Sequence, residues 1–122
     1  MTDLRIGVIG TGMMGCEHIR NVNALPGATI TAVSDPNEKP LGWARDNLGE
    51  RADTVHYFGD HRDLLLSGQV DAVIVASPNH THVDVLRDVL ASDVPVLVEK
   101  PMCTTVDDCR IVVDMAGRRS AI

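Results

Sequence analysis

The first candidate site is a glycine pattern near the N-terminus, Gly-x-Gly-x-x-Gly, formed by Gly10-Thr11-Gly12-Met13-Met14-Gly15. A β-branched run precedes it and a helical pattern follows, the context of a dinucleotide-binding turn. There Gly10 permits the tight turn, Gly12 lets a pyrophosphate approach the main chain, and Gly15 lets helix and strand pack closely. The free N–H groups at the helix start, at Met13 and Met14, are then expected to bind the phosphates.

An acidic residue, Asp35, ends the second predicted strand, 20 residues after Gly15. The dinucleotide fingerprint expects an acid at about this distance. Its carboxylate can accept hydrogen bonds from both ribose hydroxyls, and it repels a 2′-phosphate, so the sequence favours NAD over NADP. The alternative is that Asp35 is only a turn acid before Pro36.

Two more polar segments follow buried strands: residues 76–82, with the sequence ASPNHTH, and residues 99–101, with the sequence EKP. Both are expected at carboxyl ends of central strands, where open α/β sheets bind ligands. His80 and His82 suggest a metal site, but no third ligand is near them in the sequence, and we predict no metal.

The elements that position these residues alternate along the whole chain. Apolar runs predict five strands, at 4–9, 28–33, 54–58, 71–76 and 94–98, with 54–58 at an edge. Helices are expected at 13–25, from Pro40 to Gly49, from an Asp60 cap through Leu66, around 83–90, and from a Thr105 cap to Gly117. The order predicts one α/β domain, a doubly wound, mostly parallel Rossmann sheet of five to six strands with helices on both faces. Residues 121–122 are the candidate start of the sixth strand.

Composition excludes several classes of partner. The chain has 122 residues, 44% of them hydrophobic, and a net charge of −6, so we expect neither nucleic acid nor an anionic membrane surface to bind. No apolar run approaches the ~20 residues of a membrane-spanning helix, and the N-terminus lacks a secretory pattern. We therefore expect a cytoplasmic protein. The three cysteines, Cys16, Cys103 and Cys109, are expected to be reduced packing residues.

Together, the glycine pattern, Asp35, the 76–82 segment and the 99–101 segment resemble the Gfo/Idh/MocA oxidoreductases over essentially the whole chain. The resemblance implies hydride transfer between nicotinamide and a sugar or cyclitol hydroxyl or carbonyl group, and a homo-oligomer. One departure is Asp93, which stands where the family more usually has a glycine.

By position, the resemblance implies a catalytic role for Lys100, beside the nicotinamide, where it holds and polarises the reacting group of the substrate. A lysine in a partly desolvated cleft can donate hydrogen bonds and transfer protons. Glu99 is implied near the nicotinamide ribose. The remaining implied cofactor contacts lie on the loop along the cofactor: Ser77, Pro78, Asn79 and His82.

The resemblance also implies a C-terminal α+β substrate domain, which residues 1–122 do not contain. We therefore expect this chain to be the cofactor-binding domain of an NAD-dependent oxidoreductase and to lack turnover by itself. The alternative is a free-standing, non-enzymatic NAD-binding or redox-sensing module.

Overall fold

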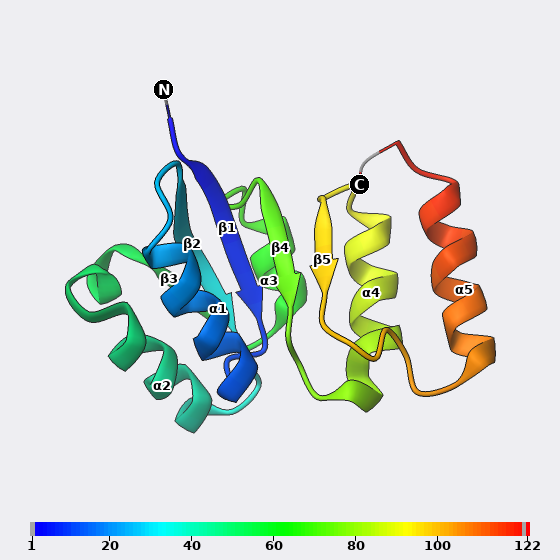
Figure 1. Ribbon diagram of the computed structural model, residues 1–122, viewed down its shortest axis with the longest axis horizontal. Coiled ribbons are helices and arrows are strands. Elements are labelled where there is room, and N and C mark those ends of the chain that lie inside the picture. The colour runs from blue at the N-terminus through cyan, green and yellow to red at the C-terminus, as the bar shows by residue number, and fades with distance from the viewer. Residues whose placement is uncertain (1, 121) are drawn as a thin grey trace.

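The computed structural model describes residues 2–120 and 122, and within them five parallel strands form one sheet (Figure 1). The strands are β1 (Leu4–Ile9), β2 (Ala28–Ser34), β3 (His56–Phe58), β4 (Ala72–Val75) and β5 (Val96–Val98). Their order is β3-β2-β1-β4-β5, which confirms the predicted doubly wound Rossmann sheet with strand 54–58 at an edge. The order reverses between β1 and β4, and open α/β sheets bind ligands at such a reversal.

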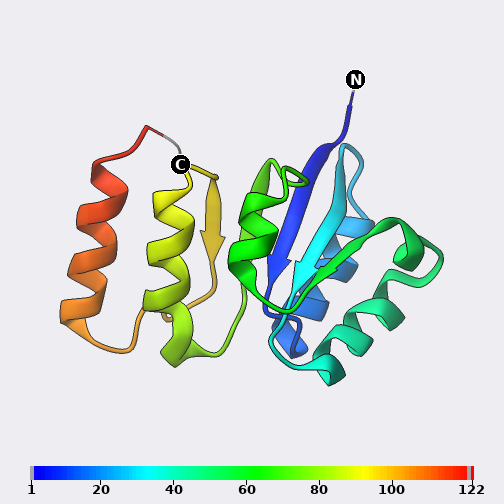
Figure 2. The ribbon, with the colours of Figure 1, turned by 180° about the vertical axis from the view of Figure 1, so that it is seen from behind.

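The described residues form five α-helices, of which the first four connect successive strands and the fifth follows β5: α1 (Met13–Asn23), α2 (Glu38–Leu48), α3 (His61–Leu66), α4 (His82–Ala91) and α5 (Val106–Gly117). Two short 3-10 helices, η1 (Gly49–Thr54) and η2 (Asn79–Thr81), complete the described elements. Helices α1 and α2 cover one face of the sheet, and α3 and α4 cover the other, as the view from behind shows (Figure 2). Helix α5 packs beside α4 (Figure 1).

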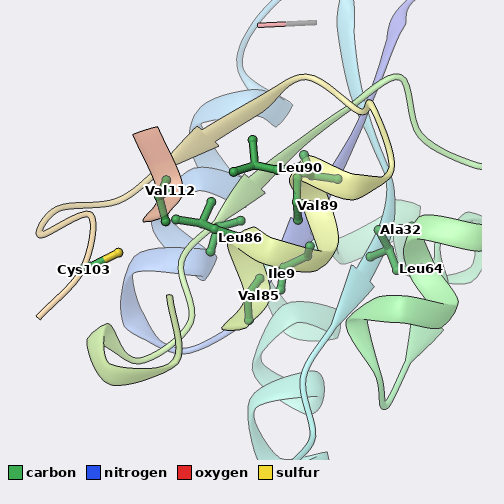
Figure 3. Packing of buried hydrophobic residues seen from close by; sticks show 11 residues of the cluster. Ile9, Ala32, Leu64, Val85, Leu86, Val89, Leu90, Cys103 and Val112 are labelled. Atoms are coloured by element: carbon green, nitrogen blue, oxygen red, sulfur yellow. The ribbon is translucent and has the colours of Figure 1, made fainter. Parts of the chain in front are cut away.

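The sheet separates two hydrophobic cores. Ile6 and Val8 of β1 point to the α1–α2 face, whereas Ile9 joins the cluster under α3 and α4 (Figure 3). This division follows from the strand geometry, because successive side chains point to opposite faces. Both faces of the central strands are therefore buried, which explains why their sequences are apolar without alternation.

Local signals set most element ends. Asp60 caps α3 by accepting a hydrogen bond from the N–H of Arg62, and Thr105 caps α5 by accepting one from Asp108. Gly49 ends α2 with φ +58°, as expected of a glycine at that position. Gly117, expected just past the last helix, is instead its final residue.

Other boundaries differ from the predictions by a few residues. Helix α1 ends at Asn23 rather than 25, and α2 begins at Glu38, ahead of Pro40. Strand β3 begins at His56 because residues 49–54 form η1. The pairing of β4 continues past its assigned ends, since the N–H groups of Asp71 and Ala76 donate to β1 carbonyls. Its shorter range is thus a matter of boundary definition.

The described C-terminal residues lie beside β5. The N–H of Val96 donates to a main-chain oxygen of Ile122 at 2.9 Å. The guanidinium group of Arg119 donates to that oxygen and to carbonyls of Val94 and Val89. Residue 121 lies outside the described residues, so a sixth strand at 121–122 stays a prediction.

The three cysteine thiols are free. Cys16 and Cys103 are buried and Cys109 is half-buried, and burial raises the pKa of the Cys16 and Cys103 thiols. We found no helix in residues 2–120 with the length and apolar character needed to cross a membrane.

Candidate functional site

A cleft of about 850 Å³ opens at the carboxyl edge of the sheet, where β1, β2 and β4 end. Its walls come from the glycine turn, the end of β2, the start of α3, and the loop between β4 and α4. The cleft therefore lies at the point where the strand order reverses. Among its lining residues are seven of the predicted site residues: Gly10, Gly12, Met13, Met14, Asp35, Ser77 and Pro78.

Two glycines of the turn are required by packing within the chain. Gly10 has φ +91°, and a Cβ atom there would lie 2.4 Å from the nitrogen of Ser77. A Cβ atom at Gly15 would lie 1.9 Å from the carbonyl oxygen of Gly10. Because real Cβ atoms do not approach so closely, neither position accepts a side chain without a shift of the main chain.

Gly12 differs from the other two. A Cβ atom at Gly12 would meet no atom of the described chain within 4 Å, and Gly12 lines the cleft. Helix α1 begins there without a hydrogen bond from a capping side chain, so the first N–H groups of the helix have no side-chain acceptor. The turn thus presents open space and main-chain donors to the cleft, an arrangement that suits a phosphate group.

Asp35 is buried at the end of β2, and its two carboxylate oxygens are held by the main chain. Oδ2 accepts from the N–H of Thr11 at 3.1 Å, and Oδ1 accepts from the N–H of Asn37 at 2.9 Å. A carboxylate has about four acceptor positions, so each oxygen keeps one for a ligand hydroxyl. The hydroxyl of Ser34 beside it is buried, lines the cleft and has no partner in the described chain.

The residues that line the cleft carry more negative than positive charge. Three aspartates, Asp35, Asp60 and Asp84, line it together with one arginine, Arg62. Both oxygens of Asp60 accept hydrogen bonds from the Arg62 guanidinium group, which lowers the pKa of Asp60 to about 2. A ligand with an extra phosphate group would therefore meet a cleft lining with a net negative charge.

The loop after β4 is held by a buried histidine. His82 is completely buried, with Nδ1 2.8 Å from the carbonyl oxygen of Pro101 and Nε2 2.9 Å from that of Ser77. It therefore joins the 76–82 segment to the 99–101 segment from inside the protein and is not on the cleft wall. Asn79 is exposed and also lies off that wall.

Glu99 and Lys100 follow β5 at the same edge of the sheet, outside the residues that line the cleft. Lys100 is exposed, and the peptide bond between it and Pro101 is cis. Oε1 of Glu99 lies 2.6 Å from Nε2 of His18 on α1, and this hydrogen bond lowers the pKa of Glu99.

Sequence reasoning missed the contribution of the start of α3, where Gly59, His61 and Arg62 line the cleft. Asp60 was interpreted only as a helix cap. The available signal was topological: the predicted edge strand 54–58 pairs with β2 in parallel, so its carboxyl end lies at the ligand-binding edge. Across residues 2–120, no three or more His, Cys, Asp or Glu side chains gather in a way that could hold a metal ion.

The strand order, the glycine turn and the cleft define the class of dinucleotide-binding Rossmann domains. Residues 4–122 match the model of the Gfo/Idh/MocA family, described as an oxidoreductase family with an NAD-binding Rossmann fold, and the chain belongs to this family.

Relatives in this family include inositol 2-dehydrogenase 1 of Saccharopolyspora erythraea, 40% identical over 111 residues, 90% of this chain and 32% of the relative. Inositol 2-dehydrogenase of Acidiphilium cryptum is 44% identical over 103 residues, 84% of this chain and 30% of the relative. The crystal structure of myo-inositol dehydrogenase from Lactobacillus casei, in complex with NAD(H) and myo-inositol, has a TM-score of 0.86 at 32% identity. It covers 98% of this chain, which spans 34% of that structure.

This chain therefore spans about a third of the length of the curated relatives it matches. The relatives are named as dehydrogenases, so the comparisons do not favour the alternative of a non-enzymatic module.

Proposed function

We propose that residues 1–122 form the cofactor-binding domain of an NAD-dependent oxidoreductase and that NAD binds in the cleft at the carboxyl edge of the sheet. The observation that carries this proposal is the pairing of open space at Gly12 with the buried carboxylate of Asp35, both on the cleft wall. The first provides main-chain donors for the pyrophosphate, and the second provides two acceptors for the adenosine ribose.

We assign the other residues positions along the cofactor from the strand order, and we assign Lys100 its catalytic role from the resemblance. A dinucleotide whose ribose is bound at the end of β2 and whose pyrophosphate is bound at β1 extends toward β4 and β5. Gly10 and Gly15 shape the turn, and Met13 and Met14 supply helix N–H groups. Ser77, Pro78 and Asn79 lie along the path beyond the pyrophosphate, and His82 holds their loop in place. Glu99 and Lys100 then lie at the nicotinamide end, where Lys100 is the catalytic residue.

NAD, when bound, supplies the acceptor for a hydride from an alcohol carbon. The named activities of the relatives support a cyclitol or sugar as the substrate class. The relatives are about three times as long as this chain, which supports a second, substrate-binding domain in the whole protein. We extend the proposal to a homo-oligomeric whole protein on the resemblance alone.

The test is calorimetric titration of the chain with NAD and NADP. NAD should bind more tightly, and Asp35→Ala should weaken NAD binding by roughly 1–3 kcal/mol, because ribose hydroxyls lose their acceptor. NADP binding should weaken less, since the substitution also removes charge repulsion. Equal losses for both cofactors would reject the ribose role of Asp35.

Asp35 also holds the N–H groups of Thr11 and Asn37, so Asp35→Ala affects the protein as well as the ligand. Urea unfolding of the same variant separates the two effects. A crystal of the chain soaked with NAD provides the direct check: density elsewhere, or none at saturation, contradicts the proposal.

A further inference from the structure

A partly buried hydrogen bond joins the helix of the glycine turn to the end of β5. Nε2 of His18 on α1 lies 2.6 Å from Oε1 of Glu99, with 20% and 23% of the two side chains exposed. The two residues are 81 positions apart in the sequence. With its proton on Nε2, His18 donates to the carboxylate even when the ring is uncharged.

Lys100 directly follows Glu99 in the chain and affects its carboxyl group. The main-chain N–H and the positive charge of Lys100 both help to lower the pKa of the Glu99 carboxyl group, after the larger effect of His18. The Glu99 carboxylate is thus held by a side chain of α1, and Lys100 is the next residue in the chain. The N–H of Glu99 itself donates to the carbonyl of Val75 at 2.9 Å, which ties this segment to β4.

We propose that His18 is a positioning residue: it orients the Glu99 carboxylate and so ties α1 to the segment from which the Lys100 side chain extends. This inference rests on the proposed function, because it assigns the supported segment to the nicotinamide end of the cofactor. His18 is hydrogen-bonded to Glu99 and is 20% exposed, so we assign it a role through Glu99.

The first test needs no cofactor. Carbon NMR of the Glu99 carboxyl group and nitrogen NMR of the Lys100 amide are measured in the wild-type chain, in His18→Ala and in His18→Gln. Alanine should move the Glu99 titration to higher pH and shift the Lys100 amide resonance. Glutamine has an N–H donor at a similar reach, so it should restore both signals.

Glu17→Gln is the matched control. Glu17 is exposed on α1, next to His18, and pairs with Arg20 on the same helix. Its substitution should leave the Glu99 titration and the Lys100 amide unchanged. If His18→Ala also leaves both signals unchanged, or if glutamine fails to restore them while the fold is intact, the proposed role of His18 is wrong.

The second test compares NAD with ADP-ribose, which lacks the nicotinamide. His18→Ala should weaken NAD binding about two- to tenfold, the range expected for one net hydrogen bond, and leave ADP-ribose binding unchanged. A general loosening of α1 would weaken both ligands equally and would contradict the inference. Failure of the wild-type chain to bind either ligand would instead reject the proposed function, while the NMR result on Glu99 would stand.

Discussion

The three glycines of the turn, to which the sequence pattern assigns different roles, also have different surroundings in the structure. Gly10 and Gly15 are needed for the chain to fold, since a Cβ atom at either would lie within 2.4 Å of a main-chain atom. Gly12 has φ −71°, which any residue can adopt, and open space around it. The missing side chain at Gly12 is therefore not needed for folding, and it leaves room in the cleft for a bound ligand.

This difference predicts opposite behaviour of two alanine variants. Gly12→Ala should leave the free energy of unfolding within about 0.5 kcal/mol of the wild type but weaken NAD binding about tenfold or more. Gly15→Ala should lower the free energy of unfolding by about 3 kcal/mol or more, because the new methyl group overlaps the Gly10 carbonyl. Urea unfolding and calorimetry measure the two quantities. A stable Gly15→Ala variant, or unchanged NAD binding by Gly12→Ala, would contradict this assignment.

At the scale of elements, the ends of helices and strands provide the cleft. Three of its walls are element ends: the start of α1, the end of β2 and the start of α3. Parallel strands bring these ends to one edge, where the start of α1 contributes uncapped N–H donors and the start of α3 contributes its capping side chain. Asp60, which caps α3, also lines the cleft, so a substitution there changes both the stability of the helix and the charge of the cleft.

The charge of Asp60 makes the stability of α3 depend on pH. Its pKa is lowered from 3.8 to about 2 in the folded chain by its hydrogen bonds with Arg62. The stabilisation is therefore complete above the unfolded value and is lost as the pH falls through the folded value. Asp60→Asn keeps a capping oxygen without the charge. The stability difference between wild type and Asp60→Asn, measured by urea unfolding, should be largest near neutral pH and narrow toward about pH 2. A difference independent of pH would contradict the ion-pair explanation.

The turn between α4 and β5 contains a residue in the left-handed region, Asp93, with φ +62°. The resemblance implies a glycine at this position, and a positive φ is a conformation that glycine adopts without cost. Because the left-handed region costs residues with a Cβ atom energy that glycine avoids, Asp93→Gly should raise the free energy of unfolding by up to about 1 kcal/mol. Ser92→Gly, at a right-handed position with φ −90°, should lower it instead. Thermal unfolding of both variants provides the check, and a destabilised Asp93→Gly variant would count against the argument.

At the scale of the whole molecule, one sheet lies between two hydrophobic cores, and the cleft opens at the carboxyl edge of that sheet. The net charge of −6 opposes an anionic ligand at long range, whereas the N–H groups of the glycine turn attract its phosphates locally. The fold thus places anion-binding groups in a molecule that is acidic overall.

The length of the chain relative to its relatives leads to a prediction about activity. Residues 1–122 should bind NAD but oxidise cyclitols or sugars far more slowly than ordinary dehydrogenases, because they span only about a third of the length of the relatives named as dehydrogenases. The measurement is NADH formation with a panel of cyclitols, with NAD binding confirmed in the same sample. A rate of about 1 s⁻¹ or more would overturn the prediction.

The sequence alone was enough to predict the class of fold, the glycine turn, the position of Asp35 at the end of the second strand, and the family. Each of these predictions depends on short motifs or on a regular apolar pattern. The strands at 4–9 and 28–33 and the caps at Asp60 and Thr105 were predictable for the same reason. The place of Gly117 inside the last helix and the exact ends of the other helices were not predictable, because packing decides where the last turn of a helix stops.

Only the tertiary structure decided which of the candidate residues face the cleft. His82 matched a cofactor-binding motif but is buried between two carbonyl oxygens, and Arg62 matched no motif but lines the cleft. His18 and Glu99 are far apart in the chain and meet only because α1 packs against β1, β2 and β4, within reach of the residue that follows β5. Such contacts depend on how the elements pack in three dimensions, and no local pattern in the sequence records them.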